Sequence, residues 1–300
     1  MKAGSTGLNG AVIVDKPLGW TSHDVVNKMR RLAGTRRIGH LGTLDPNATG
    51  VLPLLIGRAT RLAQFFARAE KVYEGVVQFG YSTDTYDVEG KPTSEAVEFE
   101  VDRDALETAL DAFRGPLKQV PPPVSAKKIG GGPAYKLARR NEPVELPPAD
   151  VEIFSIEITC CSGNEAGLRV HCSAGTYVRS IAHELGLAFG CGAFLKSLRR
   201  IASGEFDLSV AKTIEELSEL SGQDRFGEAV VPAADLLKAF PVEYVDPSTA
   251  AFIRQGRDFR GSPFRPPTDS RYVKAIAPDG ELLAIGEVKL PNLYHPFLVF

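Results

Sequence analysis

Residues 39–53, GHLGTLDPNATGVLP, constrain the fold more than any other stretch of this 300-residue chain. Their glycines and prolines disfavour a helix, and Pro46 keeps the preceding Asp45 out of the helical backbone region. A solvated turn would not need the leucines and valine that surround this aspartate. We therefore expect residues 35–57 to form an apolar loop that packs on the core and presents one carboxylate.

Asp45 has two possible roles on these residues alone: a turn residue or a reacting group. A carboxylate fixed among leucines has little water around it, so it either takes up a proton or stays ionised beside a cation. Arg179 lies in the first turn of a helix expected from Thr176 to Gly190, and it is a candidate for that cation. It could equally bind a loop carbonyl, and Asp-Pro turns are common, so both roles stay open.

The hydrophobic pattern predicts an α+β fold, with a mixed central sheet and peripheral helices. Residues 11–14 and 71–85 have the pattern of strands, and 151–161 with 167–175 are typical of a hairpin. We expect helices after Thr21 or Ser22, at 59–69, after Asp102 or Asp104, and at 176–190, 213–220 and 232–240.

From about Pro241 onward the chain changes to short strands and turns, which indicates a small all-β module at the C-terminus. We expect a first domain over residues 1–238 and this second module over 239–300. The chain shows no coiled-coil stripe, so we expect a monomer.

Composition indicates a globular protein, with 43% hydrophobic residues and no low-complexity tract. The apolar run before Asp15 is too short for a signal peptide, and we expect a cytoplasmic protein. The cysteines lack metal-site spacing, and phosphate-binding glycine motifs are absent from the sequence, so we expect neither a metal nor a cofactor. The four cysteines, expected as free thiols, are Cys160, Cys161, Cys172 and Cys191.

The net charge of −2 hides a strong segregation of charge. Residues 1–70 carry ten basic and four acidic side chains, and residues 121–140 carry five basic and no acidic ones. Residues 81–118 carry ten acidic and four basic side chains. Such asymmetry is typical of a surface that faces a polyanion, although uneven solvated faces would give the same counts.

Six short motifs occur in a fixed order along the chain. They are DKPLGWTS (15–22), GHLGTLDPNATGVLP (39–53), KVYEG (71–75), TDTYD (83–87), SAGTYVRS (173–180) and SLRR (197–200). Together they resemble the bacterial TruB family, the tRNA pseudouridine(55) synthases, over roughly residues 8–205. The C-terminal stretch is similar to the small PUA-like RNA-binding module of that family, but only in its pattern of short strands and turns.

The resemblance implies a pseudouridine-synthase fold and a role for each matching residue. Asp45 matches the catalytic aspartate, Arg179 the arginine that pairs with it, and Tyr73 the tyrosine that stacks on the base and serves proton transfer. Asp87 matches a carboxylate near the RNA-binding face, without an assigned role. The residues that match substrate-binding positions are His40, Tyr73, Tyr177 and Leu198.

The reaction that the resemblance implies fits these residues. Converting uridine to pseudouridine breaks N1–C1′, turns the base and joins C5 to C1′, which needs no redox change. The base must leave its stack and stay in a closed apolar pocket, which suits extrusion from the T-loop of tRNA. Basic residues would then hold the phosphates, and we expect Lys16, Lys127, Lys128 and Arg139 to contact the RNA.

Two other functions remain as alternatives. An N-glycosidase would use two carboxylates, such as Asp45 with Asp84 or Asp87, and would release free base. A non-enzymatic RNA-binding or chaperone protein would use Asp45 only to shape a turn, and Asp45→Asn would then leave its activity intact.

Overall fold

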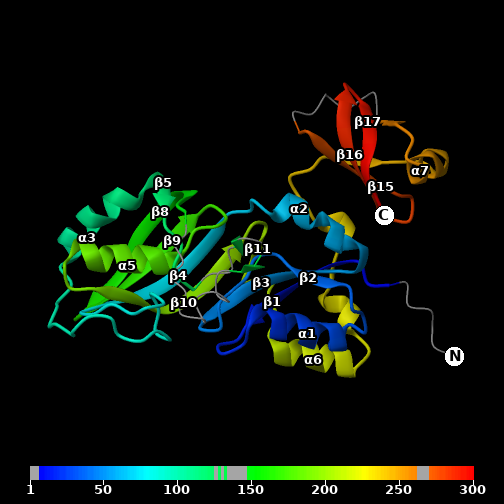
Figure 1. Cartoon of the computed structure of the whole chain (residues 1–300). Helices are drawn as coiled ribbons and strands as arrows, with labels where there is room; N and C mark the ends of the chain where they lie inside the picture. The colour runs from blue at the N-terminus through cyan, green and yellow to red at the C-terminus, as the bar shows by residue number, and fades with distance from the viewer. Residues whose placement is uncertain (1–6, 125–127, 130–131, 134–146, 262–269) are drawn as a thin grey trace.

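The computed structural model describes residues 7–124, 128–129, 132–133, 147–261 and 270–300 of the chain. These residues form a large mixed sheet with helices around it and a separate small sheet at the C-terminus (Figure 1). The observed class is therefore α+β, as predicted. Within the described residues, every helix is too short or too polar to span a bilayer.

The large sheet has ten strands, with β12-β1-β3-β10-β4-β9-β8-β5 as its main order. Neighbouring strands are antiparallel except β3 and β10, which run parallel although they lie far apart in the chain. Off the main order, β2 pairs with β3 and β11 with β10. The strands are β1 (Gly10–Lys16), β2 (Ile38–His40), β3 (Ala48–Ile56), β4 (Lys71–Phe79), β5 (Gly115–Gln119), β8 (Ala149–Ser162), β9 (Glu165–Cys172), β10 (Ala193–Ser203), β11 (Phe206–Asp207) and β12 (Val231–Pro232).

The helices cover the two ends of this sheet. Figure 1 shows α1 and α6 together below β1 and β3, whereas α3 and α5 lie at the β5 end. The α-helices are α1 (Ser22–Leu32), α2 (Ala63–Phe66), α3 (Arg103–Leu110), α5 (Val178–Ala188), α6 (Ile214–Gly222) and α7 (Pro247–Arg254). The 3-10 helices are η1 (Gly57–Leu62), η2 (Asp111–Phe113), η3 (Phe226–Ala229) and η4 (Ala233–Asp235).

Local capping explains why several predicted elements are confirmed. Thr21 caps α1 by a reciprocal hydrogen-bond pair with Asp24, which satisfies two free backbone N–H groups at the helix start. Asp102 caps α3 by accepting from two backbone N–H groups. The hairpin of β8 and β9 also forms, with its turn at residues 163–164.

The prediction that residues 35–57 are one loop was wrong. Residues 48–56 form strand β3, and only residues 41–47 remain as a bend between β2 and β3. Val51 and Leu55 face one apolar cluster, while Leu52 and Leu54 face another. A strand buried on both faces has no alternating pattern, which is why this apolar segment did not look like a strand.

The predicted helix at 232–240 was also wrong, since only the short η4 forms there. Leu237 has a left-handed backbone (φ 55°), which ends any helix. The Glu205 carboxylate accepts from the backbone N–H groups of Leu237 and Lys238, both at 2.9 Å. A contact from the β10–β11 turn therefore determines this linker, and such a contact is invisible in local sequence.

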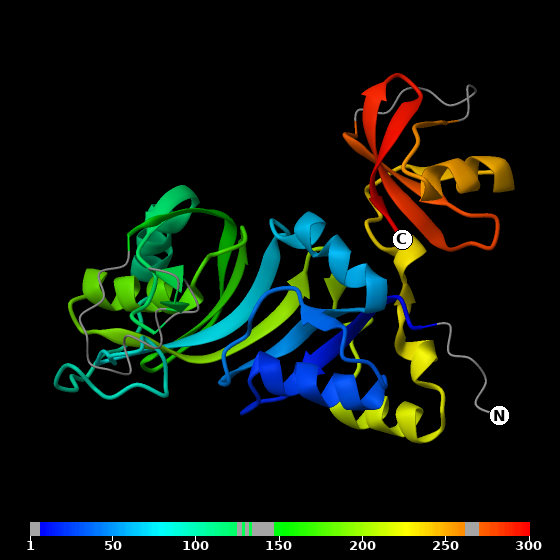
Figure 2. The same ribbon diagram turned by 45° about the vertical axis from the view of Figure 1, so that its right-hand side comes forward.

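The C-terminal sheet has five strands in the order β13-β15-β16-β17-β14, and helix α7 packs against it. It stands apart from the large sheet at upper right in Figures 1 and 2, beyond α2 and the linker. Its strands are β13 (Val242–Tyr244), β14 (Phe259–Arg260), β15 (Tyr272–Ile276), β16 (Leu282–Leu290) and β17 (Leu293–Val299). A separate two-stranded ribbon pairs β6 (Lys128–Ile129) with β7 (Gly132–Pro133).

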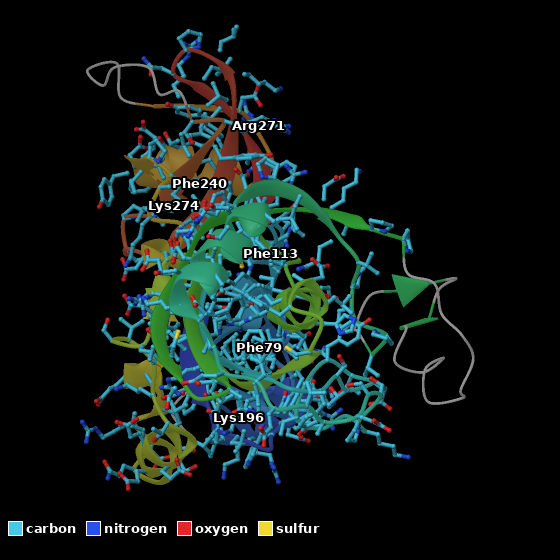
Figure 3. All side chains as sticks on the ribbon, turned by 90° about the vertical axis from the view of Figure 1, so that its left-hand side faces the viewer. Phe79, Phe113, Lys196, Phe240, Arg271 and Lys274 are labelled. Atoms are coloured by element: carbon cyan, nitrogen blue, oxygen red, sulfur yellow. The ribbon has the colours of Figure 1, made fainter. Side chains whose placement is uncertain are left out.

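Apolar packing joins the two sheets. One core cluster lies within the first sheet and its helices, and includes Phe79 and Phe113, which Figure 3 labels. A second cluster combines Ile13 and Leu55 of the first sheet with residues of the C-terminal sheet, such as Ile285. The face of β1 and β3 that α1 and α6 leave free is therefore covered by η1 and the linker, which lie between it and the C-terminal sheet.

Candidate active site

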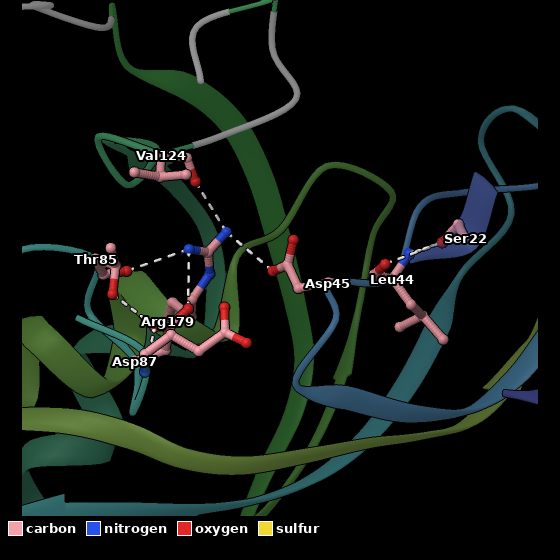
Figure 4. Close-up of polar contacts among 8 residues, drawn as sticks. Ser22, Leu44, Asp45, Thr85, Asp87, Val124 and Arg179 are labelled. Atoms are coloured by element: carbon pink, nitrogen blue, oxygen red, sulfur yellow. Dashed lines mark hydrogen bonds and ion pairs between the residues drawn. The ribbon is translucent and has the colours of Figure 1, made fainter. Parts of the chain in front are cut away.

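The bend at residues 41–47 is held rigidly on both sides of Asp45. The Ser22 hydroxyl donates to the Leu44 carbonyl (2.9 Å) and accepts from the Leu44 N–H (2.8 Å). The Pro46 carbonyl accepts from the Gly19 N–H at 2.8 Å. Figure 4 shows the Ser22–Leu44 contacts beside Asp45. The KPLGWTS segment is thus the support for the aspartate bend.

Lys16 lies beneath this bend and is fully buried. Its ammonium group donates to the carbonyls of Pro17 (3.0 Å), Trp20 (2.6 Å) and Pro46 (3.3 Å). Burial lowers the pKa of Lys16 to about 8, an effect that the nearby Asp45 charge opposes. The predicted RNA contact of Lys16 does not fit this position, because its charge is used inside the protein to hold the bend.

Arg179 connects Asp45 to a second carboxylate. Its Nη2 lies 2.9 Å from Asp45 Oδ2, and its Nη1 lies 3.2 Å from Asp87 Oδ2. The same two nitrogens also donate to the carbonyls of Thr85 (Nη1, 3.2 Å) and Val124 (Nη2, 3.0 Å) (Figure 4). A guanidinium with four fixed acceptors has little freedom to turn, so it gives Asp45 a fixed cationic partner.

Asp87 has a defined place that its sequence match did not supply. Its side chain is only 4% exposed, and its Oδ1 accepts from the Thr85 hydroxyl at 2.6 Å. The same oxygen accepts from the Glu89 N–H at 3.1 Å. With Arg179 on its other oxygen, both carboxylate oxygens of the buried Asp87 have partners, so its position orients Arg179 rather than facing a substrate.

The first turn of α5, which carries Arg179, is attached to the chain after β5. The buried Gln119 side chain pairs with the Tyr177 backbone, accepting from its N–H (2.7 Å) and donating to its carbonyl (3.0 Å). The Ser180 hydroxyl donates to the Val120 carbonyl at 2.7 Å. These contacts fix the start of the helix, and therefore the direction of the arginine.

Asp45, Arg179, Tyr73, Tyr177 and Leu198 all line one cavity of about 460 Å³. They come from the bend, the start of α5, β4 and β10, so the tertiary fold alone brings them together. The Asp45 side chain is 41% exposed. The expectation that it is sequestered from solvent was wrong, because its carboxylate faces this cavity instead of the core.

Tyr73 lies on β4 in the wall of the cavity and is buried. Burial raises its pKa, and the neighbouring Arg200 guanidinium only partly opposes the shift. Tyr73 is therefore a neutral phenol at neutral pH. In this state it offers a flat ring and one O–H that can donate or accept a hydrogen bond.

Arg200 and Lys71 also line the cavity, and sequence reasoning assigned neither of them a role. Arg200 is 1% exposed and donates to the carbonyls of Val51 (2.7 Å) and Gly42 (3.2 Å). Lys71 donates to the Ala69 carbonyl, and burial lowers its pKa. The SLRR motif was the available signal for Arg200, since two adjacent arginines on a strand point to opposite faces.

His40 lies apart from the five predicted residues that meet in the cavity. It is the last residue of β2 and lies opposite Leu54 of β3. Among the described residues, His40 is not one of those that line the cavity. Burial and the nearby Arg200 charge lower its pKa, so His40 is neutral at pH 7. Of the predicted RNA contacts, Lys127 and Arg139 fall outside the described residues, and Lys128 is described by its backbone alone.

The comparisons with known proteins agree with this arrangement. Residues 30–178 match the family described as "TruB family pseudouridylate synthase (N terminal domain)", and residues 179–238 match the "tRNA pseudouridylate synthase B C-terminal domain". A protein from Solibacter usitatus named "tRNA pseudouridine synthase B" is 59% identical over 97% of this chain and 100% of its own length. This chain belongs to the TruB family.

Further TruB relatives match over a similar share of both chains. Proteins named "tRNA pseudouridine synthase B" from Thermobifida fusca and Aquifex aeolicus are 42% and 38% identical, over 97% and 94% of this chain and 98% and 96% of their own lengths. A solved structure titled "Crystal Structure of a Cbf5-Nop10-Gar1 Complex" matches with a TM-score of 0.70 and 26% identity, over 95% of this chain and 80% of that one. These similarities therefore extend over both sheets of the chain.

Proposed function

We propose that this chain converts uridine to pseudouridine at position 55 in the T-loop of tRNA, with Asp45 as the reacting group. The observation that carries the proposal is the Asp45 carboxylate, which is paired with Arg179 at 2.9 Å and faces a cavity of about 460 Å³. Such a cavity accepts one flipped-out nucleotide. The TruB membership supports the same reaction, since its relatives are named for it.

The chemistry needs an ionised carboxylate at one point. Asp45 can attack C1′, remove a sugar proton to give a glycal-like intermediate, or add to C6 of the base. All three routes use a negatively charged carboxylate, and the Arg179 guanidinium lies 2.9 Å from Asp45 Oδ2 as its cationic partner. In the net reaction the N1–C1′ bond is replaced by C5–C1′, C5 loses a proton and N1 gains one.

The cavity walls keep the detached base in place. Leu198 and the Tyr73 ring supply apolar surface, and Tyr177 lies at the start of α5 beside Arg179. Tyr73 holds its proton at neutral pH. Its phenol can therefore give this proton to the base and take one back within the same turnover. The main role of Asp87 in this proposal is to hold Arg179, as a positioning residue.

The N-glycosidase alternative is disfavoured by the position of Asp87. A glycosidase needs a second carboxylate that is free to exchange a proton or activate water. Asp87 is buried and bound to Arg179 and the Thr85 hydroxyl. Asp84 is exposed, and its Oδ1 accepts from the Lys91 N–H at 2.8 Å. The alternative therefore depends on Asp84 alone.

A single experiment separates these functions. Incubating a uridine-labelled T-arm transcript with the enzyme should yield pseudouridine in intact RNA, whereas a glycosidase would yield free uracil. Asp45→Asn should abolish product formation with little change in RNA affinity, because the amide keeps the shape but not the charge. Asp84→Asn is the matched control and should keep the activity. Full turnover by Asp45→Asn would overturn the proposal.

The remaining parts of the chain have supporting roles in this proposal. The basic segment 121–140, with Lys127, Lys128 and Arg139, contacts phosphates of the T-arm. Residues 1–238 form the catalytic domain, and residues 239–300 form a PUA-like module that contacts RNA. The enzyme acts as a monomer in the cytoplasm, without a metal or cofactor.

A further inference from the structure

Tyr86 has a backbone conformation that a tyrosine rarely adopts. Its φ is 64°, in the left-handed region, which costs free energy for a residue with a side chain. Glycine would adopt this conformation without that cost. The ring of Tyr86 makes one interaction that helps to offset this strain.

The interaction is a parallel stack on His183. The ring centroids of Tyr86 and His183 are 3.7 Å apart and the ring planes differ by only 6°. Both residues are half-buried. Burial lowers the pKa of His183, so the imidazole is neutral at pH 7 and stacks as an uncharged ring.

The stack lies next to the contacts that hold Arg179. Tyr86 is flanked by Thr85 and Asp87, and both of these bind Nη1 of Arg179 at 3.2 Å. His183 lies one helical turn after Arg179 on α5. Helix α5 is therefore joined to the 85–87 segment at two points, by the arginine and by the stacked rings.

The other side of the segment is attached to β10. The Leu195 N–H donates to the Tyr86 carbonyl at 3.0 Å, and the Val88 N–H donates to the Leu195 carbonyl at 3.1 Å. The Tyr86 N–H also donates to the Thr83 carbonyl at 3.3 Å, so backbone hydrogen bonds hold this residue on both sides. The ring stack adds a side-chain constraint that comes from α5.

We propose that Tyr86 and His183 form a positioning pair, which holds residues 85–87 in the conformation that lets Arg179 bind Asp87 and Asp45 together. The inference rests on the proposed function, because it concerns the orientation of the arginine in that reaction. Without the stack, the left-handed residue relaxes and moves the Thr85 carbonyl and the Asp87 carboxylate away from Nη1. Arg179 then loses part of its support while the cavity and the RNA-binding surface stay unchanged.

Tyr86→Gly is the informative variant, because it removes the stacked ring and leaves a residue that adopts left-handed and right-handed backbone conformations almost equally readily. A purely structural role predicts a lower melting temperature with a matching loss of active protein. The positioning role predicts a melting temperature and tRNA Kd close to wild type, and a single-turnover rate lower by on the order of 10- to 100-fold. Tyr86→Phe, which keeps the ring, should retain most of the wild-type rate.

His183 provides the partner test. His183→Ala should slow the single-turnover rate like Tyr86→Gly, and the double variant should be no slower than either single one, since both remove the same contact. His183→Phe should restore much of the rate. Amide hydrogen exchange should be faster at residues 85–88 in both Tyr86→Gly and His183→Ala.

The possible outcomes are distinguishable. Wild-type rates in Tyr86→Gly, a slowed Tyr86→Phe, or additive effects in the double variant would overturn the positioning pair while leaving the proposed function intact. A wild-type protein that forms no pseudouridine in T-arm RNA would overturn the proposed function, and this inference with it.

Discussion

The ammonium of Lys16 and the carboxylate of Asp45 occupy opposite sides of one short bend, and only the carboxylate faces the cavity. The buried lysine donates hydrogen bonds to carbonyl oxygens beneath the bend. The Asp45 carboxylate instead pairs with Arg179, and its side chain is partly exposed. Two charged residues in neighbouring motifs thus differ in role, because one is in the core and the other is at a surface.

The lowered pKa of Lys16 predicts a pH dependence of stability. The pKa is about 8 in the folded protein and 10.5 for a free lysine. Between these pH values the unfolded chain binds the proton more strongly, so the stability contributed by Lys16 rises with pH across this window. The free energy of unfolding of wild type minus that of Lys16→Met should therefore increase from about pH 8 to about 10.5. A flat or falling difference would contradict the buried position.

Tyr73→Phe tests whether the phenol takes part in chemistry. Phenylalanine keeps the ring that lines the cavity and removes the O–H, so base stacking remains while proton transfer is lost. We expect a single-turnover rate lower by roughly 10²-fold or more, with a tRNA Kd within a few-fold of wild type. If Kd rises while the rate stays near wild type, Tyr73 acts in binding only.

Helix α5 packs closely on β10 at Gly186. At Gly186 an added Cβ would lie 2.0 Å from the Ala193 backbone nitrogen, so the helix touches the first residue of β10. This close approach holds the C-terminal end of α5, which carries Arg179 in its first turn, against the sheet. Alanine usually stabilises a helix relative to glycine, but here the order should be reversed.

We expect Gly186→Ala to lower the free energy of unfolding by about 1–3 kcal/mol, because backbone must move to admit the methyl group. Gly222→Ala in α6 is the matched control, since nothing lies within 4 Å of its added Cβ. That variant should be neutral or more stable by up to about 1 kcal/mol. Urea unfolding of the two proteins measures the difference, and equal effects would argue against close packing at Gly186.

Elements with local signals were predictable from sequence, and those set by distant partners were not. Helices α1 and α3 carry their own caps at Thr21 and Asp102. Strand β10 went unrecognised, since it lies in the middle of the sheet yet carries Arg199 and Arg200. Both arginines bind groups from early strands, and sequence neighbours cannot reveal such partners.

The same division holds within the site. The pairing of Asp45 with Arg179 followed from charge chemistry and family resemblance, and the ion pair is present in the structure. The role of Asp87 in holding Arg179 depends on a loop, a helix and a strand meeting at one point. That meeting is a property of the tertiary fold, so the motif alone could place the acid near the site but not on the arginine.

At the scale of the whole molecule, the surface charge predicts salt-sensitive RNA binding. The net charge is only −2, but residues 1–70 have six more basic than acidic side chains. Release of counterions from bound phosphates makes log Kd rise linearly with log salt. We expect tRNA affinity to fall on the order of 10³-fold between about 50 and 200 mM salt, by filter binding. An affinity independent of salt would contradict the proposed phosphate contacts.

The parallel pairing of β3 with β10 has a consequence for how the enzyme is made. Asp45 leaves the ribosome early, but Arg179, Leu198 and Arg200 emerge only after most of the chain has been translated. A nascent polypeptide therefore carries its reacting acid for much of translation without a cavity around it. Only the joining of these distant strands, which is slow because it closes a long loop, assembles the site, so a translation product that ends before β10 lacks Leu198 and Arg200 of the cavity.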